Sequence, residues 1–170
     1  MNARNYSTRL AGQIGENLMV AELGRRGIIA TALAGNVPDI DVLAFANNRS
    51  VAIQVKTVRR GDIQLDASRY LRIAFDDKKQ FVTGLNEEID RDLIFAVVAI
   101  GSCYGEDKFF IFKQGYLQDI IYRNHTSFLH RNNNVRPKSP MSTHCAYRLT
   151  DIGTALNQWS IIQDALGGEW

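Results

Sequence analysis

The chain has 170 residues, of which 45% are hydrophobic and 22% are charged, and its formal net charge is +2. This length suits one compact domain with a full core, and the composition excludes collagen-like, low-complexity and disordered chains. The longest apolar run, LIFAVVAI at 93–100, is much shorter than the roughly 18 residues that a membrane-spanning helix requires.

The two cysteines, Cys103 and Cys145, lie far apart and fit neither a disulfide framework nor the paired spacing of metal ligands. The N-terminal segment MNARNYSTRL contains no apolar stretch of the kind found in secretory signals. We therefore expect a cytoplasmic protein without membrane association.

The first predicted element is an amphipathic helix. Ser7 or Thr8 can cap its N-terminus, and apolar side chains recur behind them at spacings of three and four. Gly27 is a typical stop signal, so the helix should end at about Arg26.

Three strands are predicted to follow this helix. The pair Asn47-Asn48 is a turn signal between two apolar segments, so the second and third strands should form a hairpin. The three strands are expected at 28–33, 39–45 and 50–58.

The remainder of the chain is predicted to contain further strands and two helices. A continuous apolar run is typical of a central strand, whereas a basic, Asn-rich and Pro-containing stretch is typical of a loop. Strands are expected at 69–75, 92–101, 108–113 and 143–149, helices from Gln114 to about Arg123 and from Thr150 or Asp151 to about Leu166, a loop or short helix at 76–90, and a long loop at 124–142.

The third strand carries an unusual pair of polar side chains. Because side chains alternate along a strand, Gln54 and Lys56 share one face, while Val55 points to the other. Strands in a mixed sheet usually carry apolar residues at such positions, so this pair indicates a functional role. The acidic residues before it include Asp41 at the start of the partner strand and Glu16 on the first helix.

These residues resemble the signature of the PD-(D/E)XK nuclease superfamily. In that signature an acidic residue opens one strand of a hairpin, and an acid or its amide, any residue and Lys follow on the next strand. The matching positions are Asp41 and Gln54-Val55-Lys56, with Glu16 as the acid on the preceding helix. The Q-x-K version is similar to that of a group I intron homing endonuclease of this superfamily. The resemblance implies a restriction-endonuclease-like α/β fold, a central mixed β-sheet flanked by helices with an α-β-β-β-α-β core, in a single domain spanning residues 1–170.

The resemblance also implies a metal-dependent endonuclease that hydrolyses the phosphodiester bonds of DNA. Magnesium, or manganese in its place, takes oxygen ligands, which Asp41, Gln54, the carbonyl of Val55 and Glu16 can supply. Lys56 would stabilise the attacking water and the phosphate. Because Gln54 is neutral, we expect weaker metal affinity than a Glu at that position would give.

A second acid, Asp39, shares a face with Asp41 if the strand begins early. Pro38-Asp39 is the literal Pro-Asp pair, whereas Asp41 is the residue that an apolar strand core follows, in IDVLAF. We favour Asp41 as the metal ligand. Asp39 could then be a loop residue, a helper ligand or a turn cap.

Basic residues gather in two places. No Asp or Glu occurs between Ile120 and Thr150, and a shorter basic cluster surrounds Lys56. Both could contact the phosphates of DNA, although a solvated basic loop is the alternative interpretation of the longer segment. The predicted nucleic-acid-binding residues are Arg59, Arg60, Arg123, Arg131, Arg136 and Lys138. Because cutting both strands requires two active sites, the resemblance implies a homodimer.

Two other functions agree with the same residues. A non-catalytic module could keep the fold and bind nucleic acid, with Gln54 as a sign of lost activity, and a junction resolvase would differ only in its substrate. Each site residue taken alone also has an ordinary structural interpretation, such as a solvated helix carboxylate for Glu16. His125, His130 and His144 lack the spacing of zinc ligands, so no metal site is predicted there.

Overall fold

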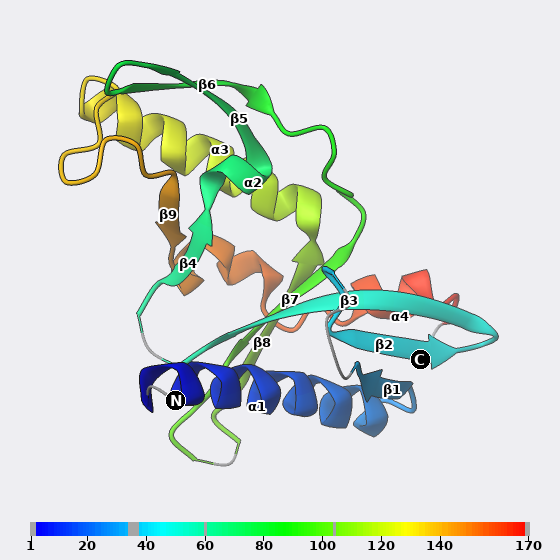
Figure 1. Cartoon of the computed structure of the whole chain (residues 1–170). Coiled ribbons are helices and arrows are strands. Elements are labelled where there is room, and N and C mark those ends of the chain that lie inside the picture. Colours follow the sequence, from blue (N-terminus) through cyan, green and yellow to red (C-terminus); the bar gives the residue numbers. More distant parts are fainter. Residues whose placement is uncertain (1–2, 34–37, 60, 104, 169–170) are drawn as a thin grey trace. The chain divides into compact units, whose positions relative to one another are not determined.

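The computed structural model of the chain describes residues 3–33, 38–59, 61–103 and 105–168, with side chains from residue 7 onward (Figure 1). The chain divides into two compact units. The first unit comprises Met1–Gly61, Leu93–Lys113 and Ile152–Trp170, and the second comprises Asp62–Asp92 and Gln114–Asp151. Residues 34–37 of the predicted turn before the second strand lie outside the described residues.

A five-stranded sheet forms the centre of the first unit. Its strands, in their order across the sheet, are β1 (Ile29–Ala32), β2 (Val42–Ala46), β3 (Arg49–Val58), β7 (Ile94–Ala99) and β8 (Lys108–Lys113). The neighbours β3 and β7 run parallel, whereas the other neighbouring pairs run antiparallel. The predicted mixed sheet flanked by helices is therefore confirmed.

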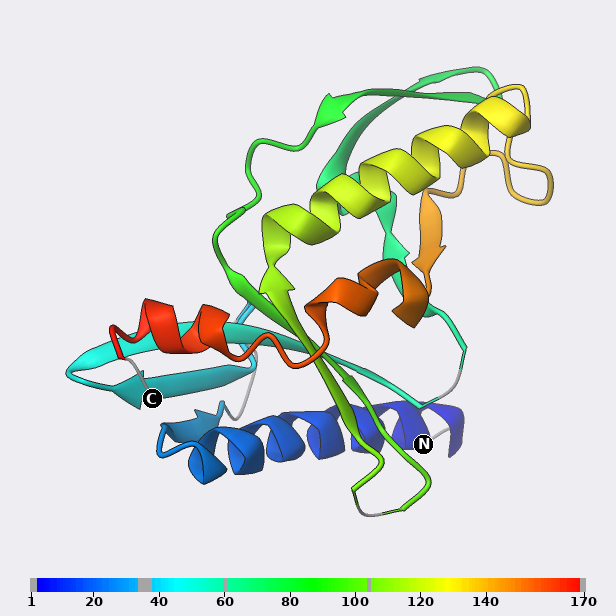
Figure 2. The same cartoon turned by 180° about the vertical axis from the view of Figure 1, so that it is seen from behind.

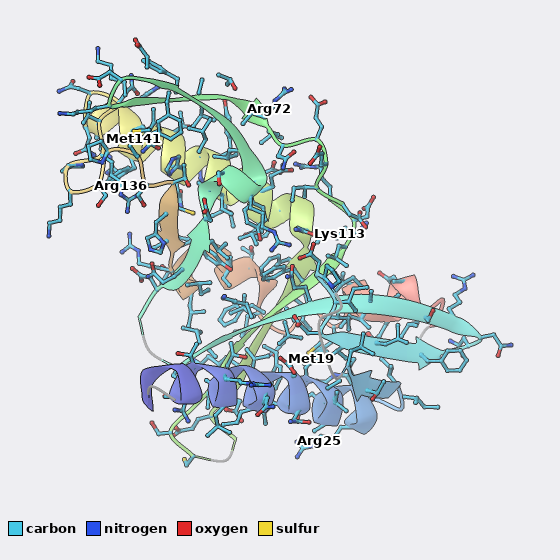
Figure 3. All side chains as sticks on the ribbon, in the orientation of Figure 1. Met19, Arg25, Arg72, Lys113, Arg136 and Met141 are labelled. Atoms are coloured by element: carbon cyan, nitrogen blue, oxygen red, sulfur yellow. The ribbon has the colours of Figure 1, made fainter. Side chains whose placement is uncertain are left out.

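Two helices pack on this sheet, α1 (Ala3–Arg25) against β1 and β3 and α4 (Ser160–Ala165) against β3 and β8 (Figures 1 and 2). Met19 lies on the side of α1 that faces the strands, and Arg25 lies on the opposite side (Figure 3). Both helices share one core with β2, β3, β7 and β8, which includes Met19, Leu23, Ile53, Ala96, Ile111, Trp159 and Ile162. In the described part of the chain, no helix combines the length and the apolar character needed to cross a bilayer.

The predicted hairpin of β2 and β3 is present. Asn47 and Asn48 have φ values of 51° and 57°, and two such left-handed residues form the turn that matches the twist of paired strands. Along β2, buried and exposed residues alternate, so that Val42 and Ala44 enter the core. β7 has a continuous buried run instead, as a central strand requires.

The second unit consists of two antiparallel strand pairs and a long helix. β4 (Ile63–Asp66) pairs with β9 (His144–Tyr147), and β5 (Leu71–Asp76) pairs with β6 (Lys79–Leu85). The short helix α2 (Ala67–Tyr70) joins β4 to β5, and α3 (Gln114–Arg131) packs against α2, β5, β6 and β9. The crossover between the parallel strands β3 and β7 therefore includes three strands and one short helix.

The prediction of a loop or short helix at 76–90 is wrong, because this segment contains β6. Both strands of the β5–β6 hairpin are largely exposed, so they lack the apolar alternation that marks a half-buried strand. The one buried residue of β6 is Gln80, whose side-chain amide donates to the backbone carbonyls of Pro140 and Ser142. Because the buried residue of β6 is polar, the sequence lacks the buried apolar residue that would have indicated the inward face of this strand.

The predicted end of the second helix at about Arg123 is also wrong, because α3 continues to Arg131. Ile121, His125 and Leu129 form a buried stripe at a spacing of four. Because His125 is polar, the apolar periodicity of a helix is interrupted there. The sequence after Arg123 is therefore more typical of a polar loop.

The predicted helix from Thr150 or Asp151 to Leu166 is broken into the 3₁₀ segment η1 (Leu149–Ala155) and α4. Between them, Asn157 adopts a positive φ of 55° and its N–H donates to the carbonyl of Phe109. This contact with β8 replaces a helical hydrogen bond and separates the two helical segments.

Candidate active site

Strands β2 and β3 separate beyond the pair Val42 and Ile53, and Asp41 lies at the point of separation. The N–H of Asp41 still donates to the carbonyl of Ile53, at 3.0 Å. The N–H of Val55 donates instead to the side chain of Asp41, with 2.7 Å between the nitrogen and Oδ2. A charge-assisted hydrogen bond of this length holds the carboxylate against β3.

The residues on either side of Val55 are the polar pair of the motif. In a strand the N–H and C=O of one residue point to the same edge, so the carbonyl of Val55 is directed to the edge where Asp41 lies. Gln54 is partly buried and Lys56 is exposed, and both project from the face opposite to the Val55 side chain. Gln54, Val55 and Lys56 are consecutive on β3, and the Asp41 carboxylate is bound to the middle one of the three.

The amide oxygen of Gln54, Oε1, is buried and has no hydrogen-bond partner. Buried polar side-chain atoms are nearly always paired, so an unpaired one needs an explanation. Leaving such an atom unsatisfied costs about 1–3 kcal/mol, which a cation or a water molecule at this position would recover.

A close contact between α1 and β3 brings Glu16 to the same region. A Cβ atom at Gly15 would lie 2.0 Å from Oγ1 of Thr57, so only glycine permits this approach. Oγ1 of Thr57 also donates to the carbonyl of Gly12, at 3.5 Å. Burial, and secondly the negative charge of Asp41, raise the pKa of the Glu16 carboxyl group. The two acidic side chains therefore interact electrostatically.

The site offers two carboxylates, one amide oxygen and one backbone carbonyl. These are hard oxygen donors, which suit magnesium or manganese rather than zinc. Within the described ranges, no group of three or more His, Cys, Asp or Glu side chains could hold a metal ion. Oxygen donors of this kind suit a divalent ion that completes its shell with water or substrate oxygens.

Asp39 lies apart from this arrangement, in the turn before β2. It is exposed and has a positive φ of 64°. The hydrogen bond to Val55 belongs to Asp41, and this contact favours Asp41 over Asp39 as the acid of the site.

The predicted nucleic-acid-binding residues are divided between the two units. Arg59 follows β3 in the first unit, and Arg60 lies outside the described residues. The others belong to the second unit, on α3 or on the loop after it, and they are Arg123, Arg131, Arg136 and Lys138. Arg136 is partly buried, whereas Arg59, Arg123, Arg131 and Lys138 are exposed.

The residues that set α1 against β3 were not predicted from the sequence. Gly12 and Gly15 lie three residues apart on one face of the helix, opposite Thr57. This glycine spacing, one residue before Glu16, is the signal that could have predicted a close helix–strand contact at the site.

No protein-family model and no curated protein matches the sequence of the chain. Among solved structures, the chain is similar to the bacterial homing endonuclease I-Ssp6803I, with a TM-score of 0.50 and 12% sequence identity. The similarity covers 92% of this chain and 93% of that chain. At this identity it shows the fold, a mixed α/β arrangement with a central sheet flanked by helices.

Proposed function

We propose that the protein is a metal-dependent endonuclease that hydrolyses DNA phosphodiester bonds, with residues 1–170 acting as one PD-(D/E)XK nuclease-like domain. The observation that carries this proposal is the buried, unpaired Oε1 of Gln54, one residue from the N–H that holds the Asp41 carboxylate. The fold similarity to a bacterial homing endonuclease supports it.

In this proposal, Asp41, Gln54, the carbonyl of Val55 and Glu16 hold a magnesium ion, or a manganese ion in its place. When bound, such an ion polarises the phosphate and lowers the pKa of a coordinated water. The hydrogen bond from Val55 orients Asp41 toward the site. The contact of Gly15 with Thr57 sets the position of Glu16.

Lys56 is the proposed electrostatic catalyst. Its side chain is exposed on the same face as Gln54, so its ammonium group can approach a phosphate from solvent. Removing a donor of this kind typically costs about 3 kcal/mol, or roughly a hundredfold in rate. Arg59, Arg60, Arg123, Arg131, Arg136 and Lys138 are the proposed contacts to the DNA backbone, and a homodimer would supply the two sites needed to cut both strands.

The test is cleavage of supercoiled plasmid, branched DNA and single strands by the purified protein with magnesium, with manganese and with EDTA. Asp41→Ala and Lys56→Ala are compared with the wild type. Lys108→Ala, which removes an exposed lysine at the start of β8, is the control for loss of a positive charge. We expect metal-dependent cleavage that both site variants lose and the control retains.

A non-catalytic nucleic-acid-binding module is the second candidate, because the site contains only two carboxylates among its proposed ligands. This candidate predicts no cleavage on any of the three substrates, together with equal DNA binding by the wild type, Asp41→Ala and Lys56→Ala. That result would replace the endonuclease proposal.

A further inference from the structure

A second candidate site lies wholly within the second unit. A cavity of about 390 Å³ is formed by α3, β9 and the segments next to β9. This volume is within the range of roughly 300–1,000 Å³ that is typical of small-molecule sites. None of Glu16, Asp41, Gln54 and Lys56 lines it, so it is separate from the candidate active site.

Two buried side chains of this cavity have unpaired polar atoms. His125 on α3 is 4% exposed and Tyr147 on β9 is 2% exposed, and both line the cavity. Nε2 of His125 and the hydroxyl oxygen of Tyr147 have no hydrogen-bond partner. Two unsatisfied polar groups in one cavity are uncommon in a folded protein, and a ligand that supplies their partners would explain both.

The charged side chains of the cavity favour an anion. Three arginines, Arg131, Arg136 and Arg148, line it together with two acids, Asp62 and Asp151. The acid Asp151 already accepts a hydrogen bond from the backbone N–H of Arg148, at 2.9 Å. Guanidinium groups carry several N–H donors in a fixed fork that matches phosphate oxygens.

The cavity also has an apolar wall that a bare phosphate would leave uncovered. Phe128 and Ile121 contribute to the lining, as do the polar side chains of Asn124 and Ser127. The guanidinium carbon of Arg136 lies 5.7 Å from the centre of the Phe128 ring. A cationic group that can bind a phosphate and an aromatic contact surface therefore occur side by side, which suits a ligand with a phosphate and a planar ring.

The ionisable groups of the cavity favour binding over covalent chemistry. Burial, and secondly the charge of Arg136, lower the pKa of His125, so its ring is neutral near pH 7. Burial raises the pKa of the Cys145 thiol to about 11. Since the thiolate is the reactive form, Cys145 is a poor nucleophile at neutral pH.

We propose that this cavity binds a nucleotide, with the phosphate on Arg131, Arg136 and Arg148 and the base against Phe128. The hydroxyl of Tyr147 and Nε2 of His125 then form hydrogen bonds with the ligand. The nucleotide comes from solution as a free monophosphate or from a nucleic-acid strand as one unit, and the chemistry is the same in both cases. This proposal does not depend on cleavage at Asp41 and Lys56.

The test is calorimetric titration of the full chain in EDTA, so that metal binding at the first site makes no contribution. The probes are 2′-deoxynucleoside 5′-monophosphates, the matching nucleosides, inorganic phosphate and a short single-stranded oligonucleotide. Backbone amide shifts of residues 144–148 identify the binding location. Tighter binding of the monophosphate than of either fragment indicates a site for free nucleotides, and binding of the oligonucleotide alone indicates a site for a unit of a strand. Both results support the proposal.

Tyr147→Phe is the decisive variant, because it removes only a hydroxyl group that has no partner to lose. We expect it to weaken nucleotide binding by roughly three- to tenfold without lowering the melting temperature. Tyr122→Phe removes an exposed hydroxyl from α3 outside the cavity, and it should bind like the wild type.

Arg148→Gln tests the charge and should weaken binding by roughly tenfold or more. Lys78→Gln, an exposed position in the β5–β6 turn, is its control. The proposal is wrong if no probe shifts the amides of residues 144–148, or if Tyr147→Phe and Arg148→Gln both bind like the wild type. Asp41→Ala should bind as the wild type does, which separates this test from the endonuclease proposal.

Discussion

The carboxylate of Asp41 takes the place of a strand partner for Val55, because its Oδ2 accepts the Val55 N–H at 2.7 Å. β2 begins only at Val42, so no ladder residue of that strand reaches this N–H. Asp41 therefore has a structural role through its hydrogen bond and an electrostatic role through its charge. The two roles can be separated, since an amide oxygen accepts a hydrogen bond without carrying charge.

Asp41→Asn should abolish metal-dependent cleavage while the protein stays folded, with a loss of about 1 kcal/mol in the free energy of unfolding. The matched control is Asp39→Asn, because Asn tolerates the positive φ of that turn. It should retain cleavage. Plasmid cleavage rates and thermal melts check both variants. An inactive Asp39→Asn beside an active Asp41→Asn would transfer the catalytic role to Asp39.

The unpaired Oε1 of Gln54 leads to a prediction about metal affinity. Gln54→Glu adds a third carboxylate near Asp41 and Glu16, so the metal-free protein should be less stable and magnesium or manganese should raise its melting temperature more than that of the wild type. In Gln54→Leu, magnesium or manganese should no longer raise the melting temperature, whereas the stability of the metal-free protein should not fall. Gln64→Glu, on an exposed position of β4, is the control. Equal metal responses in all four proteins would contradict the ligand role of Gln54.

The sequence predicted the β2–β3 hairpin and the strand β8 because both depend on local signals. Asn47 and Asn48 favour the left-handed turn by their own chemistry, and KFFIFK at 108–113 forms a strand with the predicted bounds. The hydrogen bond between Asp41 and Val55 was not predictable, because it depends on where the β2–β3 ladder ends.

The second unit was predicted less well because its inward faces contain polar residues. Gln80 and His125 are buried polar residues, and each interrupts the apolar periodicity that would have indicated β6 or the second half of α3. The break at Asn157 depends on a hydrogen bond to Phe109, which is distant in sequence. The bounds of β6, α3 and α4 therefore depend on tertiary contacts, which local sequence patterns do not show.

The contact between Gly15 and Thr57 leads to a prediction about α1. Gly15→Ala should destabilise the protein by about 1–3 kcal/mol, because its Cβ would overlap Thr57. It should also slow cleavage, since the displaced helix carries Glu16. Gly24→Ala is the matched control on the same helix, with open space around the new methyl group, and should be neutral or stabilising by up to about 1 kcal/mol. Urea unfolding and cleavage rates measure both effects. Equal behaviour of the two variants would exclude a tight helix–strand contact.

Burial lowers the pKa of His125 in the folded protein below the ordinary value of 6.5, with a further lowering by Arg136 and an opposing effect of Asp66. The unfolded chain therefore binds a proton more readily than the folded protein does. The stability from neutral His125 is fully present above about pH 6.5 and decreases as the pH falls below that value, by at most about 1.4 kcal/mol per pH unit.

His125→Gln should reduce this pH dependence between pH 7.5 and 5, because the variant has no titrating group at that position. His130→Gln replaces an exposed histidine on the same helix and should keep the dependence of the wild type. Urea unfolding at a series of pH values gives the slopes directly. Asp66, whose pKa is lowered chiefly by its hydrogen bond from Thr143, contributes only at lower pH, so the difference between the two variants isolates His125. A slope that is unchanged in His125→Gln would show that His125 is not a buried neutral group.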